Sequence, residues 1–188
     1  MSSLQKWQVL NSQMLINHPF CQVRRDEVEL SNGKVIDDYF VNIKPDVALV
    51  LPITHDQKVV FVRQYRHAVG DFFIELPAGR FYPGEESAEA AALRELREET
   101  GYVAENLRKI GTLHDNPSKE TNQTHLFLAE NVVKVGEQQN LDLTEEIEVI
   151  LMPINAIFEK ITTGEISVAG TVAALFLGLK IKPDSYIN

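Results

Sequence analysis

One apolar run constrains the fold of this chain more than any other segment. Asp46–Ile53 (DVALVLPI) is almost continuously hydrophobic and lacks the polar–apolar alternation of a strand with one face in water. Such a run is suited to a strand that is buried on both faces. We therefore expect it to lie inside a sheet that other elements cover.

Shorter segments on either side predict further strands. Glu27–Leu30 (EVEL) is followed by the turn SNG at 31–33, a strong β-hairpin signal, and then by Val35–Ile43. After a polar turn at 55–57, Lys58–Arg66 (KVVFVRQYR) is predicted to be the hairpin partner of the buried run. Other strands are predicted at 72–76, 107–113, 124–129 and 146–153.

The clearest predicted helix is the segment 88–100 (AEAAALRELREET). It is rich in helix-forming residues, Ser87 is placed to cap its start, and Gly101 is placed to end it. Two further helices are predicted at 154–162 and 169–179. Because strands and helices mix without regular βαβ alternation, the pattern predicts an α+β domain with a mixed sheet. We expect this domain at 46–188, with residues 1–45 as an appendage of antiparallel strands.

Composition excludes several classes of function. The chain has 188 residues, a net charge of −9 and a single cysteine, Cys21. The negative charge argues against a nucleic-acid partner, which needs a clustered basic surface, and one cysteine allows no internal disulfide. The N-terminus lacks the pattern of a signal peptide, and no apolar stretch is long enough to cross a bilayer. We therefore expect a cytoplasmic protein without a membrane partner.

Three glutamates form the most informative cluster of candidate functional residues. Glu95, Glu98 and Glu99 occupy positions i, i+3 and i+4 of the predicted helix and face one sector of it. Carboxylates this close repel one another, and a hard dication removes the repulsion by taking oxygen ligands at about 2.0–2.6 Å. Arg94, four residues before Glu98, is placed to hold that carboxylate. The alternative is an ordinary solvated face of an acidic helix.

The surrounding residues distinguish these two alternatives. The segment 79–102 (GRFYPGEESAEAAALRELREETGY) resembles the signature box of the Nudix hydrolases, and its tail at 94–102 matches the family pattern REUxEExGU at all nine positions, where U is an aliphatic or aromatic residue. The resemblance implies an α/β/α sandwich with a mixed sheet between helices. It also implies hydrolysis of a nucleoside diphosphate linked to a variable group X, with Mg²⁺ or Mn²⁺ bound by Glu95, Glu98 and Glu99 and by the carbonyl of Ala78.

The opening of the box departs from the family spacing Gx5Ex7R. The glycine-to-glutamate spacing, with five residues between, is found for Gly79 and Glu85. The glutamate-to-arginine spacing, with seven residues between, is found for Glu86 and Arg94, so the loop carries one extra residue. Either Glu85 or Glu86 can fill the role of the first glutamate, as a further metal ligand. We prefer Glu86, because the helical register to Arg94 is harder to change than the length of a loop.

The resemblance also implies a general base outside the box. In the ADP-ribose branch of the family this is often a glutamate on a later loop, and the matching segment here is 143–149 (LTEEIEV). Glu145 is our first candidate and Glu146 the second, with an ordinary acidic loop as the alternative. Glu98, Glu99 and Arg94 complete the predicted catalytic set.

Residues upstream of the box point to the substrate. The motifs QYR at 64–66 and ELPAG at 75–79 resemble those of ADP-ribose pyrophosphatases, as does Pro117, which lies 15 residues after Tyr102. Arg66 would contact a phosphate or the terminal ribose, or would only pair with Glu75. By the same resemblance the N-terminal strands form a homodimer interface and line the substrate. Aromatic residues on them, Phe20 and Tyr39, would sandwich adenine; core packing is the alternative for each.

The predicted function is a metal-dependent enzyme that splits ADP-ribose into AMP and ribose 5-phosphate. Where many relatives carry Ser-Pro-Gly near Pro117, this chain has DNPSKETN at 115–122, which leaves the group X open. The same chemistry on another nucleotide sugar or a dinucleotide, such as GDP-mannose, is the first alternative. An alternative of another class is a non-catalytic module that senses a nucleotide sugar. Such modules often lose box glutamates or gain a DNA-binding domain, and this chain shows neither.

Overall fold

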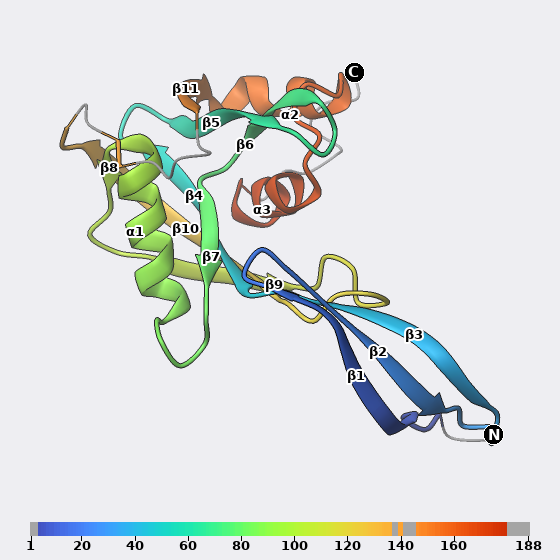
Figure 1. Ribbon diagram of the computed structural model, residues 1–188. Helices are drawn as coiled ribbons and strands as arrows, with labels where there is room; N and C mark the ends of the chain where they lie inside the picture. The colour runs from blue at the N-terminus through green and yellow to red at the C-terminus, as the bar shows by residue number, and fades with distance from the viewer. Residues whose placement is uncertain (1–3, 137–138, 141–145, 180–188) are drawn as a thin grey trace. The chain divides into compact units, whose positions relative to one another are not determined.

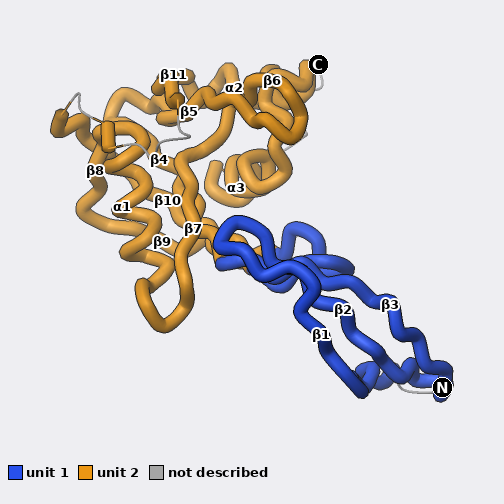
Figure 2. Tube along the Cα trace, in the orientation of Figure 1, with its two compact units in different colours: residues 1–45, 114–122 blue, residues 46–113, 123–188 orange. Residues whose placement is uncertain are grey.

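The computed structural model in Figure 1 describes residues 4–136, 139–140 and 146–179. The chain divides into two compact units, which Figure 2 colours separately. Unit 1 contains residues 1–45 and 114–122, and unit 2 contains residues 46–113 and 123–188. None of the helices among the described residues has the length and apolar composition needed to cross a lipid bilayer.

Unit 2 is built around the apolar run that the sequence singles out. This run forms β4 (Asp46–Thr54), which is buried from Ala48 onward and pairs in parallel with β10 (Thr124–Lys134). The main path of the sheet runs β11-β5-β4-β10-β8, with β6, β7 and β9 (Arg108–Leu113) paired beside it. Parallel and antiparallel pairs both occur, so the predicted mixed sheet is confirmed.

Helices cover both faces of this sheet, as Figure 1 shows. Leu49 and Leu51 of β4 belong to a core that also contains residues of α2 (Ile154–Thr162) and α3 (Ala169–Leu179). The alternate residues Ala48 and Val50 belong to a second core, shared with α1 (Ala88–Thr100). Successive side chains of a strand point to opposite faces, so one continuous apolar strand serves two cores. The predicted α+β fold with a sheet between helices is confirmed.

The predicted hairpin of the buried run is confirmed, because Lys58–Arg66 forms β5, which pairs antiparallel with β4 next to the turn at 55–57 through Ile53↔Val59. Longer ladders join β5 to β11 (Ile147–Pro153) and β6 (Asp71–Glu75). Two short strands, β7 (Ala78–Phe81) and β8 (Tyr102–Val103), were missed. Both begin beside a proline or glycine, and their pairing partners, β4 and β10, are distant in sequence.

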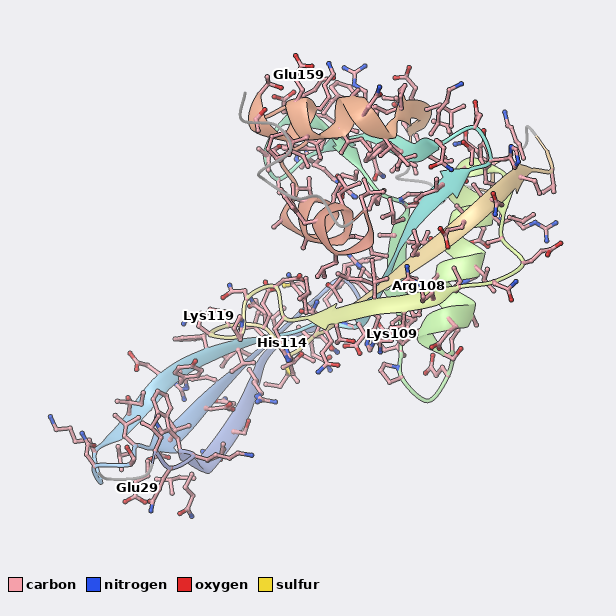
Figure 3. All side chains as sticks on the ribbon, turned by 180° about the vertical axis from the view of Figure 1, so that it is seen from behind. Glu29, Arg108, Lys109, His114, Lys119 and Glu159 are labelled. Atoms are coloured by element: carbon pink, nitrogen blue, oxygen red, sulfur yellow. The ribbon has the colours of Figure 1, made fainter. Side chains whose placement is uncertain are left out.

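Unit 1 contains a three-stranded antiparallel sheet in the order β1-β2-β3, formed by Gln8–His18, Cys21–Glu29 and Val35–Ile43. The predicted turn at 31–33 joins β2 to β3, with Gly33 at φ 79°. The loop 114–122 lies beside β3 and is bonded to it: Asn42 N donates to Lys119 O at 2.7 Å, and Thr121 N donates to Asn42 O at 3.2 Å. Figure 3 labels Lys119 on this loop.

Candidate active site

Helix α1 presents its glutamates inward. Ser87 caps the start of α1, where its side chain accepts from Ala90 N, and Gly101 caps the end in a left-handed conformation with φ 72°. Glu95 and Glu99 are 9% and 4% exposed, and Glu98 is half-buried. A solvated acidic face would leave all three carboxylates in water, so that alternative is wrong. Buried carboxylates are retained where partners compensate for their lost hydration.

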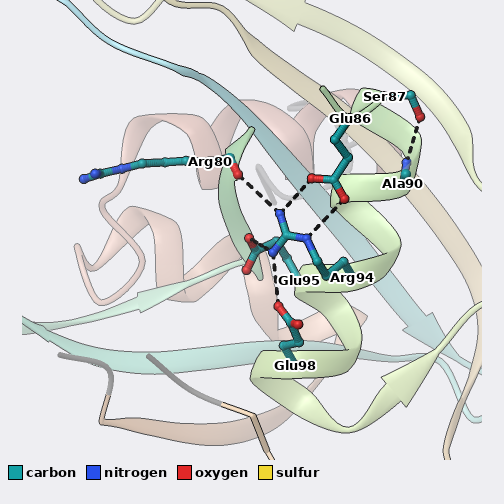
Figure 4. Close-up of polar contacts among 7 residues, drawn as sticks. All are labelled: Arg80, Glu86, Ser87, Ala90, Arg94, Glu95 and Glu98. Atoms are coloured by element: carbon teal, nitrogen blue, oxygen red, sulfur yellow. Dashed lines mark hydrogen bonds and ion pairs between the residues drawn. The ribbon is translucent and has the colours of Figure 1, made fainter. Parts of the chain in front are cut away.

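Arg94 is the central partner of this cluster (Figure 4). Its guanidinium binds Glu86 in a bidentate manner, with Nε–Oε1 at 3.1 Å and Nη2–Oε2 at 3.0 Å. Its Nη1 donates to Glu95 Oε1 at 2.6 Å and to Glu98 Oε2 at 3.1 Å. The three carboxylates, Glu86 foremost, raise the pKa of Arg94 above its ordinary value. The guanidinium therefore stays charged and fixes three carboxylates around one point.

The geometry around Arg94 distinguishes the two glutamates of the box opening. Glu86 is half-buried and forms the bidentate pair described above, whereas the side chain of Glu85 is exposed. The inserted loop residue is thus accommodated in the turn at 82–86, where the main-chain N–H groups of Glu85 and Glu86 both donate to Tyr82 O. The eight-residue separation of Glu86 and Arg94 is the one that brings carboxylate and guanidinium together.

Strand β7 borders two of the helix carboxylates. Ala78 N donates to Glu99 Oε2 at 3.1 Å, which ties that carboxylate to the strand backbone. A Cβ atom added at Gly79 would lie 1.8 Å from Glu95 Oε1, so only glycine leaves space for this carboxylate. The pattern ELPAG therefore places a main-chain donor and a residue without a side chain directly against α1.

The donor chemistry of this cluster fits a hard divalent cation. Three carboxylates, from Glu86, Glu95 and Glu98, contact a single guanidinium, and the fourth, from Glu99, is held by the backbone of β7, so the cluster has net negative charge. All of these donors are oxygens, which Mg²⁺, Mn²⁺ and Ca²⁺ prefer. As the side chains of the described residues stand, no three acidic, His or Cys groups are arranged around a vacant metal position. A cation would compete with Arg94 for Glu95 and Glu98.

A segment that the sequence did not single out caps the carboxyl-terminal end of α1. Asn140 N donates to Glu98 O at 3.0 Å, and Val135 N donates to Gly101 O at 3.0 Å. The side-chain amide of Gln139 donates to Glu99 O. These contacts go to main-chain oxygens, which explains why no sequence motif reveals them. Gln139 and Asn140 also line a hollow of about 800 Å³, together with Arg94, Arg97 and Glu98.

Other predicted site residues of unit 2 lie on separate elements. Arg66, at the end of β5, forms a bidentate pair with Glu75, with Nε–Oε1 at 2.7 Å and Nη2–Oε2 at 2.9 Å. The predicted alternative of an Arg66–Glu75 pair is therefore present. Glu145 lies outside the described residues, and Glu146 is exposed immediately before β11.

Three predicted substrate contacts belong to unit 1. Phe20 is 82% exposed in the turn between β1 and β2, so core packing within one chain does not explain it. Tyr39 is half-buried; its hydroxyl donates to Ser118 O at 2.7 Å, and the ammonium of Lys119 lies 5.2 Å from its ring centroid. Pro117 is exposed on the same loop. Tyr39 and the loop around Pro117 are thus joined within one unit.

Two family models match this chain. Residues 44–174 match the NUDIX domain, and residues 7–42 match the nucleoside diphosphate sugar hydrolase N-terminal domain. The boundary between the two matches lies at the end of β3, next to the boundary between the two structural units at Pro45.

Similar proteins cover nearly the same length. The chain is 36% identical to the ADP-ribose pyrophosphatase of Bacillus subtilis (strain 168) over 156 residues, which is 82% of this chain and 83% of that protein. It is 29% identical to the methanol dehydrogenase activator of Bacillus methanolicus over 93% of this chain and 94% of the other. Among solved structures, an ADP compounds hydrolase matches with a TM-score of 0.84 at 26% identity, covering 96% of each chain.

Proposed function

The chain belongs to the Nudix hydrolase family, and from this premise we propose that it hydrolyses the pyrophosphate bond of ADP-ribose to give AMP and ribose 5-phosphate. The observation that carries the proposal is the convergence of Glu86, Glu95 and Glu98 on Arg94, with Glu99 held against β7. The similarity to an ADP-ribose pyrophosphatase over 82% of the chain supports this choice of substrate.

We assign the metal site to the carboxylates of Glu86, Glu95, Glu98 and Glu99 and to the carbonyl oxygen of Ala78. Nudix hydrolases generally use divalent cations, and the all-oxygen donor set favours Mg²⁺ or Mn²⁺. When bound, such a cation neutralises the charge of the pyrophosphate and acidifies water. Arg94 keeps the carboxylates oriented before substrate arrives, which reduces the reorganisation needed during the reaction.

The reaction itself is a substitution at phosphorus. A water oxygen forms a bond to one phosphorus atom, and the bond from that phosphorus to the bridging oxygen breaks, so the bridging oxygen leaves with the other phosphate. A carboxylate accepts the proton that the water releases. Our first candidate for this base is Glu145 and our second is Glu146, which directly precedes β11.

We place substrate recognition outside the box. Arg66, held by Glu75, would contact a phosphate or the terminal ribose while keeping its planar orientation. The N-terminal region 1–45 would form a homodimer and line the substrate, with Phe20 and Tyr39 stacking on adenine and Pro117 near the distal group. The Nudix domain would then occupy 46–188.

A second candidate is the same hydrolysis of another nucleotide sugar, such as GDP-mannose, or of a dinucleotide. The loop 114–122 supports this second candidate. Lys119 of this loop lies against the ring of Tyr39 in β3 and so adds a cation beside a predicted base-stacking residue. A sensing module without turnover is the remaining alternative. It is disfavoured by the complete set of box glutamates, since a binding module needs no water-activating cluster.

The decisive experiment measures release of phosphomonoester from a panel of nucleotide sugars with Mg²⁺ or Mn²⁺, for wild type and Glu98→Gln. We expect ADP-ribose to be hydrolysed with the highest kcat/KM, and Glu98→Gln to lower kcat by about 100-fold or more, because the neutral amide cannot replace a charged ligand. No turnover of any substrate, or a fully active variant, would contradict the catalytic proposal. Turnover confined to GDP-sugars would contradict only the choice of ADP-ribose.

A further inference from the structure

We propose that Gln139 is a positioning residue, whose side-chain amide holds the carboxyl-terminal end of α1 in register with the start of β11. The inference rests on the proposed hydrolysis. Helix α1 supplies Glu98 and Glu99, and β11 directly follows Glu146, the second candidate for the base. The contacts of Gln139 described below are to main-chain oxygens, so it would act through the backbone and not on the reacting atoms.

The amide of Gln139 reaches two elements at once. Its Nε2 lies 2.5 Å from the main-chain oxygen of Glu99 and 3.4 Å from the main-chain oxygen of Ile147. An amide nitrogen carries two hydrogens, so one side chain can donate to both carbonyls. Residue 99 ends the turn that carries the catalytic glutamates, and residue 147 is the first residue of β11. A single side chain therefore links the two segments that the proposed reaction needs together.

The Gln139 amide is one of three donors that bind the carbonyls at the end of α1, and we call these donors together the anchor. Asn140 N donates to Glu98 O, and Val135 N donates to Gly101 O, each at 3.0 Å. The last carbonyls of a helix have no partner within the helix and carry its negative dipole end. Donors from Val135, Gln139 and Asn140 therefore hold the backbone of the same turn from which Glu98 and Glu99 project.

The anchor lies beside the candidate active site. Gln139 and Asn140 line the same hollow of about 800 Å³ as Arg94 and Glu98. Displacements of about 1 Å in a catalytic group can cost about 100-fold in rate. Without the amide link, the end of α1 and the start of β11 would be held less firmly relative to each other, which lowers kcat more than it weakens substrate binding.

The test compares four variants of the full chain. Gln139→Met keeps the side-chain length but removes the donor, Gln139→Glu replaces the donor with a charge that carbonyl oxygens repel, and Gln139→Lys restores a donor. Asn140→Ala is the matched control, because Asn140 contributes its main-chain N–H. With Mg²⁺ and ADP-ribose we expect kcat to fall about tenfold in Gln139→Met and further in Gln139→Glu, with KM unchanged within about twofold. Gln139→Lys and Asn140→Ala should stay near wild type.

Two readouts separate the possible outcomes. Unchanged kcat in the Met and Glu variants, or a loss that lysine does not rescue, would overturn the proposal. Amide hydrogen exchange at Asn140 needs no turnover and should be faster in Gln139→Met but normal in Gln139→Lys. If wild type hydrolyses no substrate, the proposed function fails and the catalytic part of this inference fails with it. Unchanged exchange in Gln139→Met would then overturn the link itself.

Discussion

At the scale of single residues, one guanidinium controls the geometry of the cluster. Arg94 binds Glu86 through two nitrogens and donates from a third to both Glu95 and Glu98. Carboxylate oxygens of this kind are also the ligands that a divalent cation would bind. Arg94 therefore preserves the arrangement of the carboxylates, and binding of a cation would shift oxygens of Glu95 and Glu98 away from it. Substitution of Glu86, which forms the bidentate pair with Arg94, tests this role of the guanidinium directly.

We predict that Glu86→Gln lowers kcat/KM at least tenfold, whereas Glu85→Gln stays within about twofold of wild type. Glu86 loses its charged bidentate pair with Arg94, and charge-assisted hydrogen bonds are about twice as strong as neutral ones. Glu85 is exposed and is the matched control, because the two variants differ by one position and remove the same charge. Steady-state kinetics with ADP-ribose and Mg²⁺ provide the measurement. Equal losses in both variants would show that the loop register differs from the one described.

We predict that Gly79→Ala lowers activity without a large loss of stability. The new methyl group would lie 1.8 Å from Glu95 Oε1, at the flexible end of the glutamate, so the side chain can move away but cannot keep its present position. We expect kcat/KM to fall at least tenfold and the thermal midpoint to change by a few degrees at most. Gly170→Ala in α3 is the control, because its Cβ would make an ordinary contact at 3.5 Å. An active Gly79→Ala enzyme would contradict the tight approach of β7 to α1.

At the scale of secondary-structure elements, local signals account for the helices and for part of the sheet. The bounds of α1 agree with the prediction because each end of the helix is marked by a capping residue directly beside it, Ser87 at the start and Gly101 at the end. The hairpin of β4 and β5 was predicted correctly because the polar turn at 55–57 separates two apolar runs, whereas the ladder between β5 and β11 joins segments that are distant in sequence and depends on the sheet as a whole. Strand β7 was missed because its pairing with β4 is decided by tertiary contacts, and a run of four residues carries little periodicity.

The difference between local and tertiary contacts also determines which site residues the sequence could reveal. Glu95, Glu98 and Glu99 share one helix at i, i+3 and i+4, and Arg94 lies four residues before Glu98, so spacing alone predicts the carboxylate cluster and the Arg94–Glu98 pair, which the structure contains. The link from Gln139 to Glu99 O is made by a side chain to a main-chain atom 40 residues away, and such a contact leaves no pattern in the residue types at either end. Burial of Glu95 and Glu99 likewise depends on β7, which is not local to the helix.

The two ends of α1 should contribute unequally to stability. Ser87→Ala removes the side-chain acceptor of Ala90 N and should lower the free energy of unfolding by about 1 kcal/mol. Gly101→Ala should cost more, about 2 kcal/mol or above, because it forces a side chain into the left-handed region and its Cβ would lie 2.6 Å from Gly136 O. Urea unfolding followed by far-UV circular dichroism measures both. A larger loss in Ser87→Ala would contradict this order.

At the scale of the whole molecule, unit 1 presents an unusually apolar surface. All residues of β1 are exposed, and β1 is an outer strand of its sheet. Five apolar side chains on this strand are each between 44% and 55% exposed: Val9, Leu10, Met14, Leu15 and Ile16. Several exposed apolar side chains and an outer strand edge are hazards for a monomer and are typical of a protein–protein interface. This is the observation that favours the proposed homodimer.

We predict that the protein is a dimer in solution and that Ile16→Glu shifts it towards monomer. The introduced carboxylate would have to be buried at the interface, where an unpaired charge costs several kcal/mol, enough to raise the dissociation constant more than 100-fold. Gln13→Glu is the matched control: it adds the same charge to the same strand, but beside Arg25, which already donates to the Gln13 side chain. Size-exclusion chromatography with light scattering, over a range of protein concentrations, measures the shift. A wild-type protein that stays monomeric at all concentrations, or a dimer that Ile16→Glu leaves intact, would contradict an interface built on β1.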